Sequence, residues 1–314
     1  MDLERVLQFL HDCQVRGEPC VLVTVCAVEG SSMRNAGTIM GVAQDGSFAG
    51  SLSGGCIENA VVAEALDTLK TGASRLVRFG AGSRYFDIKL PCGGGIDLHF
   101  CPLVEPGITE PALKAIAARQ PISITIERGA AQFVSGWQTM RFDPETQTGT
   151  FGHWPVPRVT IIGHGAGVEA LARLGQTMGC AVEALTPDES IVADLTQLGI
   201  ASAQLERRSQ TDLLKSDPWT AIVFLFHDHD WETELLQRAL ALPHFYLGAM
   251  GGRKAHANRC EALRTRGVTD AQLETIRAPI GLFHSSRDPQ TLALSTLAEV
   301  IRAYGETDFE AEIG

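Results

Sequence analysis

The chain has 314 residues, enough for two domains of ordinary size, and 45% of them are hydrophobic. Its net charge of −11 argues against a nucleic-acid partner, which would call for a basic surface. No apolar run is long enough to cross a membrane and the N-terminus does not resemble a secretory signal, so we expect a cytoplasmic protein with no membrane partner.

The first half of the chain predicts an α+β domain over residues 1–153. The apolar spacing of residues 3–10 is typical of a helix, and the β-branched segment 20–28 is typical of a buried strand. Residues 38–42 and 47–52 are expected to form a hairpin, because the Asp-Gly pair between them is a strong turn signal.

Further strands are expected at residues 74–79 and 96–102. In the second of these, three apolar residues alternate with Asp97 and His99, which predicts one buried face. Strand-like segments at 122–127, 133–141 and 149–151 are expected to continue the same sheet.

Two of the eight cysteines lie beside glycines, in residues 53–56 (SGGC) and 92–95 (CGGG). Cys56 begins a helical pattern that runs to Lys70, and a helix N-terminus favours the thiolate and attracts anions. Tight turns that serve packing alone remain the alternative for both segments. Four other cysteines lie in apolar surroundings and are expected to fill the core, namely Cys13, Cys20, Cys26 and Cys180.

After a proline-containing linker at 155–157, residues 158–314 predict a second domain. Short apolar strands alternate with helical patterns there, which indicates a doubly wound, Rossmann-like parallel sheet. The expected strands are 159–162, 181–185, 221–226 and 245–248, and the expected helices are 168–178, 231–242 and 289–304.

A glycine loop follows the first of these strands. Gly163 and Gly165 match the start of a dinucleotide-binding fingerprint, but Val168 stands where a third glycine is expected. Thr186 occupies the position where an acidic residue would bind a ribose, and Asp188 lies two residues further on. We therefore favour a phosphate-binding loop whose ligand is not NAD.

Two polar segments follow later strands. His227, Asp228 and His229 end one strand. The two histidines could mimic a metal pair, but we favour a ligand cleft edged by His227, with Asp228 or Asp230 capping the helix that starts near Trp231. Arg253 and Lys254 follow a glycine loop and suit a phosphate, and a solvated helix start remains the alternative.

Seven short segments resemble the xanthine dehydrogenase accessory protein family (XdhC/CoxI). They are residues 30–37 (GSSMRNAG), 53–58 (SGGCIE) and 92–94 (CGG) in its N-terminal domain, and 227–229 (HDH), 246–254 (YLGAMGGRK), 278–281 (APIG) and 294–299 (LSTLAE) in its Rossmann-like domain. The resemblance covers most of the chain except residues 104–153.

This resemblance implies a chaperone for molybdenum cofactor rather than an enzyme. Such a protein holds the molybdopterin form as cargo while a NifS-type cysteine desulfurase adds sulfur, and delivers it to the molybdenum subunit of xanthine dehydrogenase or a related hydroxylase. A homodimer is left open. The expected cofactor-binding residues are Arg34, Ser53, Gly54, Gly55, Cys56, Glu58, Cys92, Gly163, Gly165, His227, Asp228, Arg253 and Lys254, with Cys56 as the expected metal ligand.

Two other classes of protein remain as alternatives. One is an NAD-linked oxidoreductase that uses the second domain, and the other is a metal-dependent hydrolase that uses His227 and His229. Neither explains the two glycine-flanked cysteines.

Overall fold

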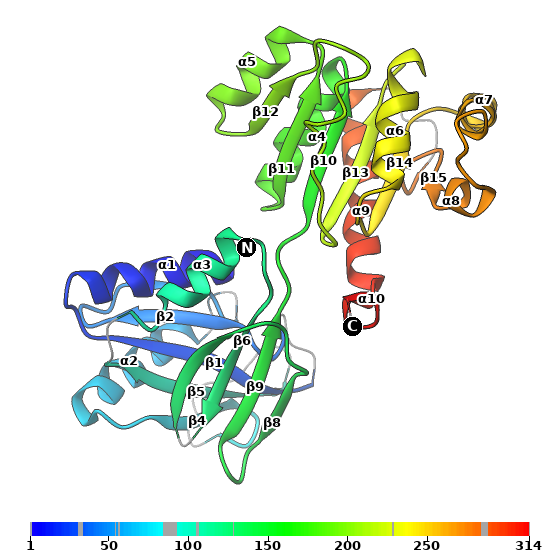
Figure 1. Ribbon diagram of the computed structural model, residues 1–314. Coiled ribbons are helices and arrows are strands. Elements are labelled where there is room, and N and C mark those ends of the chain that lie inside the picture. The colour runs from blue at the N-terminus through cyan, green and yellow to red at the C-terminus, as the bar shows by residue number, and fades with distance from the viewer. Residues whose placement is uncertain are drawn as a thin grey trace. The chain divides into compact units, whose positions relative to one another are not determined.

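The computed structural model describes residues 2–30, 34–53, 55, 57–83, 93–104, 107–127, 129–227, 229–283 and 288–313. The chain forms two compact units, Met1–Pro155 and Val156–Gly314, called here the N-terminal and C-terminal units (Figure 1). The predicted fold class is confirmed, because the N-terminal unit contains antiparallel sheets and the C-terminal unit a parallel sheet. In the described part of the chain, no helix combines the length and apolarity that crossing a membrane requires.

A five-stranded antiparallel sheet is the centre of the N-terminal unit. Its strand order is β3-β2-β1-β5-β4. The strands are β1 (Cys20–Glu29), β2 (Ile39–Ala43), β3 (Phe48–Ala49), β4 (Arg75–Gly80) and β5 (Gly95–Leu103).

Both faces of this sheet are covered. Helix α2 (Glu58–Thr71) packs on one face, while α1 (Asp2–Val15) and α3 (Glu110–Ala117) pack on the other (Figure 1). The expectation of a single buried face on β5 is therefore wrong, because His99 on the second face is fully buried.

Residues 122–153 do not continue that sheet, contrary to our expectation. They form a separate four-stranded antiparallel sheet in the order β7-β6-β9-β8, which covers the face that also carries α1. Its strands are β6 (Ile122–Glu127), β7 (Ala130–Ser135), β8 (Arg141–Asp143) and β9 (Thr148–His153). The expected strand 133–141 is divided because the chain turns at Gly136, whose φ is +89°.

The cysteines in the described part of the chain are all buried. They are Cys13, Cys20, Cys26, Cys101, Cys180 and Cys260, and they include the four that were expected to fill the core. Burial raises the pKa of both Cys20 and Cys26 to about 12, so these two thiols stay protonated at neutral pH.

The C-terminal unit contains a six-stranded parallel sheet with the order β12-β11-β10-β13-β14-β15. Its strands are β10 (Arg158–Gly163), β11 (Ala181–Thr186), β12 (Ala201–Gln204), β13 (Thr220–Leu225), β14 (Tyr246–Ala249) and β15 (Ile276–Arg277). The order reverses between β10 and β13, and the carboxyl edge at such a switch point is where doubly wound sheets bind ligands.

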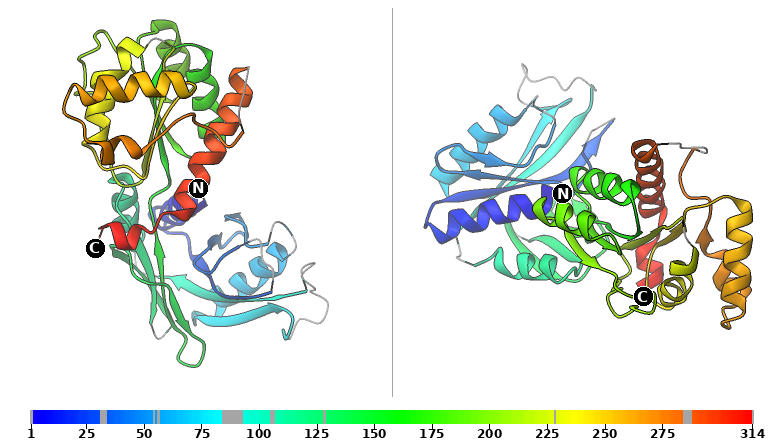
Figure 2. Two further views of the ribbon diagram at one scale, coloured as in Figure 1. Left: turned by 90° about the vertical axis from the view of Figure 1, so that its right-hand side faces the viewer. Right: turned by 90° about the horizontal axis from the view of Figure 1, so that it is seen from above.

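Helices cover both faces of the parallel sheet. One face carries α4 (Ala166–Thr177), α5 (Glu189–Gln197) and α9 (Pro289–Glu306), and α4 and α9 lie side by side there (Figure 2). The other face carries α6 (Glu232–Leu240), α7 (Arg253–Arg264) and α8 (Asp270–Glu274). A short helix, α10 (Phe309–Ile313), ends the described chain.

Candidate ligand-binding sites

Three connections that contain the predicted motifs leave the five-stranded sheet at the same end. Strand β1 ends at Glu29 opposite Gly95, the first residue of β5, and β4 ends at Gly80 opposite the same residue. Helix α2 leads into Arg75, the first residue of β4, which lies at the end of the strand away from Gly95. The N-terminus of α2 therefore points back toward the Gly95 end of the sheet. The antiparallel topology therefore gathers the β1–β2, β3–α2 and β4–β5 connections, and we call this the motif end of the sheet.

The carboxylate of Glu58 organises the connection between β3 and α2. Its two oxygens accept six hydrogen bonds at 2.8–3.2 Å, from the hydroxyls of Ser51 and Ser53 and from the N–H groups of Leu52, Ser53, Gly55 and Ile57. The side chain is almost fully buried. We call this arrangement the Glu58 cage, and it occupies both oxygens with donors from the connection itself.

The cage changes the acidity of Glu58. Burial by itself would raise the pKa, but hydrogen bonds from the Ser53 hydroxyl, the Ser53 N–H and the Ser51 hydroxyl outweigh it and lower the pKa from 4.5 to about 2. Glu58 is therefore ionised at neutral pH although it lies inside the protein.

Arg78 on β4 holds the strand ends together at the motif end. Its Nε donates to the carbonyl of Ala81 at 2.7 Å, its Nη1 donates to Asp97 at 3.0 Å, and its Nη2 pairs with Glu29. Sequence reasoning missed Arg78, because nothing in the spacing of these residues shows that three strand ends meet.

Close backbone packing explains part of the glycine run at 93–95. A Cβ atom on Gly94 would overlap the carbonyl oxygen of Glu29, and one on Gly95 would lie 2.6 Å from Nη2 of Arg78. At these two positions the glycines let the start of β5 approach β1 and β4.

Several predicted site residues fall on this end of the N-terminal unit. Ser53 and Gly55 belong to the Glu58 cage, and Arg34 lies half-buried in the β1–β2 connection. Helix α2 begins at Glu58 rather than at Cys56. Three of the predicted residues lie outside the described residues, namely Gly54, Cys56 and Cys92.

In the C-terminal unit, Gly163 ends β10 and Gly165 is the N-cap of α4. A Cβ atom on Gly163 would lie 2.7 Å from the carbonyl group of Leu225, so the close approach of β10 to β13 requires a glycine there. Gly165 has a φ of +79°, which is the conformation that favours glycine. Val168 is fully buried in the core at the position of the missing third glycine.

The Gly163→Ala variant is expected to lose about 2 kcal/mol of unfolding free energy, because the added methyl group collides with the backbone of β13. Gly167→Ala is the matched control, since its Cβ atom would keep an ordinary distance of 3.7 Å from Leu292 and the helix gains from alanine. Urea unfolding of both variants measures the difference. Equal stabilities would show that the loop tolerates side chains at both positions.

Four rings lie near the glycine loop at the switch point. The His164 ring lies 5.6 Å from the His227 ring and 5.5 Å from the Phe226 ring, and Phe226 stacks on Trp231 at 6.1 Å. The N–H of Gly165 donates to Oδ2 of Asp188 at 2.8 Å. Predicted residues Gly165 and His227 are thus brought together, whereas His164 and the contact of Asp188 were not foreseen.

Arg253 and Lys254 are the first two residues of α7, and both are exposed. Behind them, Arg259 forms a buried two-point ion pair with Glu232 of α6, and its Nη2 donates to the carbonyl of Met250 at 2.7 Å. This pair fixes the loop that leads from β14 to the two exposed cations.

The described residues do not test the metal-pair interpretation, because it needs the side chain of His229. They contain no group of three His, Cys, Asp or Glu side chains that could hold a metal ion. Asp228 lies outside the described residues, as does the side chain of His229.

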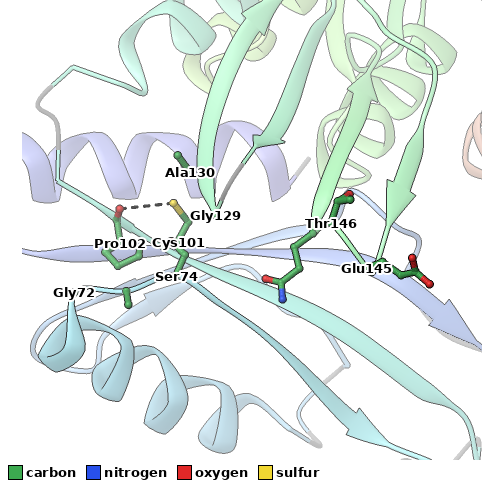
Figure 3. A pocket seen from close by; sticks show the side chains of 10 residues that line it. Gly72, Ser74, Cys101, Pro102, Gly129, Ala130, Glu145 and Thr146 are labelled. Carbon is green, nitrogen blue, oxygen red and sulfur yellow. Dashed lines mark hydrogen bonds between the residues drawn. The ribbon is translucent and has the colours of Figure 1, made fainter.

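A pocket of about 580 Å³ opens elsewhere in the N-terminal unit (Figure 3). Gly72 and Ser74 line it on one side, and the β8–β9 turn around Thr146 lines it on another. The Cys101 thiol in this pocket donates to the carbonyl of Pro102 at 3.7 Å, and burial raises its pKa. None of the predicted site residues lines this pocket.

Comparisons with known proteins match both units. The model of the XdhC and CoxI family matches residues 13–80, and that of the XdhC Rossmann domain matches residues 159–300. The molybdenum cofactor insertion chaperone PaoD of Escherichia coli K12 is 34% identical over 316 residues, which cover 98% of this chain and 91% of PaoD. The Escherichia coli K12 protein YqeB is 21% identical over 300 residues, which cover 90% of this chain and 43% of YqeB.

A solved structure agrees in fold. The crystal structure of a Bacillus halodurans protein, described there as a xanthine dehydrogenase, matches with a TM-score of 0.76 over 96% of each chain. At 19% identity this likeness concerns the fold alone.

Proposed function

Because this chain belongs to the XdhC and CoxI family, we propose that it is a molybdenum cofactor insertion chaperone and not an enzyme. It binds the molybdopterin form of the cofactor as cargo, holds it while a NifS-type cysteine desulfurase supplies sulfur, and delivers it to a xanthine dehydrogenase or a related molybdenum hydroxylase. These steps take place in the cytoplasm.

The observation that carries this proposal is the 34% identity to a named insertion chaperone over nearly the whole of both chains. The motif end supports it, because three connections meet there and one of them is held by the Glu58 cage. We assign molybdenum to Cys56, with Cys92 as the second candidate, since a soft thiolate suits a metal of this kind. The role of Glu58 is then to hold the β3–α2 connection, in which Cys56 lies, through its hydrogen bonds.

In the C-terminal unit we assign the non-metal end of the cargo to the carboxyl edge of the sheet. Arg253 and Lys254 form no ion pair with any described residue and lie at the start of a twelve-residue helix, which suits a phosphate group.

Retention of molybdenum tests the function. The full chain is mixed anaerobically with cofactor released from a molybdenum enzyme, separated from free cofactor by gel filtration, and analysed for bound molybdenum. We expect near-stoichiometric retention by the unmodified protein and a loss of at least tenfold, about 1.4 kcal/mol, in Cys56→Ala.

Cys13→Ala is the matched control, because Cys13 is a buried cysteine of α1 and is expected to leave retention unchanged. If the unmodified protein retains no molybdenum, the proposed function is wrong. If Cys56→Ala retains as much as the control, the role of that thiol is wrong.

A further inference from the structure

Asp188 occupies the N-cap position of α5 but does not cap its helix. Aspartate is favoured at this position because its carboxylate accepts hydrogen bonds from the first N–H groups of the helix. Here the side chain makes no such bond, and its Oδ2 instead accepts the N–H of Gly165 at 2.8 Å. The carboxylate of Asp188 therefore faces the glycine loop and not its own helix.

This contact changes what the glycine loop can bind. In a dinucleotide-binding loop the N–H groups at the start of the helix receive a phosphate. At Gly165 that N–H already points at a negative charge, and a phosphate placed there would be repelled by Asp188. The loop is thus suited to a ligand that donates hydrogen bonds.

Asp188 still has capacity for such a ligand. Within the part of the chain that the structure describes, its Oδ1 accepts no hydrogen bond, and the side chain is only half-buried. An ionised carboxylate can accept several hydrogen bonds through its two oxygens, and it binds best a pair of parallel N–H donors.

Two flat rings lie at the same glycine loop that Asp188 contacts. His164 immediately precedes Gly165, and its ring lies 5.6 Å from that of His227 at an angle of 44°. His164 is half-buried and His227 is exposed, so both rings are accessible to a planar ligand at the switch point.

We propose that Asp188, His164 and His227 together bind the pterin ring of the cargo, an inference that rests on the proposed function. A pterin presents its N3–H and its 2-amino group side by side, in the same fork that a guanidinium offers to a carboxylate. Asp188 accepts this donor pair, while His164 and His227 contact the face of the ring. Adenine has no such adjacent pair of ring and amino donors, so the site favours pterin over NAD.

Free pterin and lumazine test the proposal, because lumazine is the same ring with an oxygen in place of the 2-amino group. Both are fluorescent, and equilibrium dialysis against the full chain measures their dissociation constants. We expect pterin to bind at least tenfold more tightly than lumazine, since lumazine turns an acceptor toward Asp188. In Asp188→Asn this preference is expected to fall to about twofold or less.

Asp194→Asn is the matched control, because Asp194 is an exposed residue of the same helix and is expected to keep the full preference. Circular dichroism shows whether each variant is folded, and Asp188→Glu serves as a second variant that keeps the charge if Asp188→Asn is unfolded. The Glu variant is expected to retain a preference for pterin.

Three results would overturn the assignment: no binding of pterin at millimolar concentration, equal binding of pterin and lumazine, or an unchanged preference in Asp188→Asn. Binding of NADH that depends on Asp188 would also overturn it, because the carboxylate would then hold a ribose. Molybdenum retention is measured separately, so a protein that retains the cofactor but shows no pterin preference refutes this inference and leaves the proposed function intact.

Discussion

Replacing Glu58 with glutamine is expected to lower the unfolding free energy of the N-terminal unit by about 3 kcal/mol. The displacement of its pKa from 4.5 to about 2 corresponds to roughly this amount. Glutamine has the same size but offers an N–H₂ group where the cage requires an acceptor, so at least two of the donors lose their partner. We expect molybdenum retention to fall together with the stability.

Glu64→Gln is the control for this change, because Glu64 is a buried carboxylate of the same helix. Its partner Arg75 also bonds Asp67 at 2.9 Å, so the loss there should be about 1 kcal/mol. Urea unfolding measures both variants, and hydrogen exchange at the amides of Ser53 and Gly55 reports on the cage itself. Unchanged protection of these amides in Glu58→Gln would show that the carboxylate does not hold the connection.

The lowered pKa of Glu58 predicts that its contribution to the unfolding free energy depends on pH. Its folded-state pKa lies below the unfolded value, so the stabilisation is complete above the unfolded pKa of 4.5 and disappears as the pH falls toward about 2. The difference in unfolding free energy between the unmodified protein and Glu58→Gln should therefore shrink across this interval.

Removing the buried charge of Arg259 is expected to destabilise the C-terminal unit by about 3–5 kcal/mol, because the buried carboxylate of Glu232 then loses the cation that it is paired with. The two side chains are only 2% and 1% exposed. In Arg259→Met we also expect weaker phosphate binding at α7, since the loop around Met250 loses its hydrogen bond. The double variant Arg259→Met/Glu232→Met should recover part of the stability.

An exposed ion pair between α6 and the turn that follows α7 serves as the control. Arg266 pairs with Glu234 of α6 at 2.9 Å, with side chains 40% and 36% exposed. Such pairs contribute at most about 1 kcal/mol, so Arg266→Met should change little. Urea unfolding compares the variants, and equal losses in Arg259→Met and Arg266→Met would contradict the importance of burial.

Local patterns were sufficient to predict most strands and the class of each unit. The β-branched segment 20–28 and the alternation of strands and helices after residue 158 depend on the chemistry of neighbouring residues, and both are confirmed. Residues 189–197, 253–264 and 270–274 were not predicted as helices, because their apolar stripes are short and interrupted by charge.

Features that depend on tertiary contacts could not be predicted. His99 alternates with apolar residues as an exposed residue would, and only the second sheet above it explains its burial. In the same way, no local pattern shows that residues 51–57 fold back on Glu58, or that Asp188 reaches Gly165 and not its own helix.

The burial of the described cysteines has a consequence for chemical selectivity. Six of the eight thiols are enclosed by the core, and burial raises the pKa of five of them. A neutral, enclosed thiol is slow to bind soft metals, to exchange sulfur or to react with alkylating reagents. For the proposed chaperone, these six buried thiols are therefore poor competitors for the metal of its cargo.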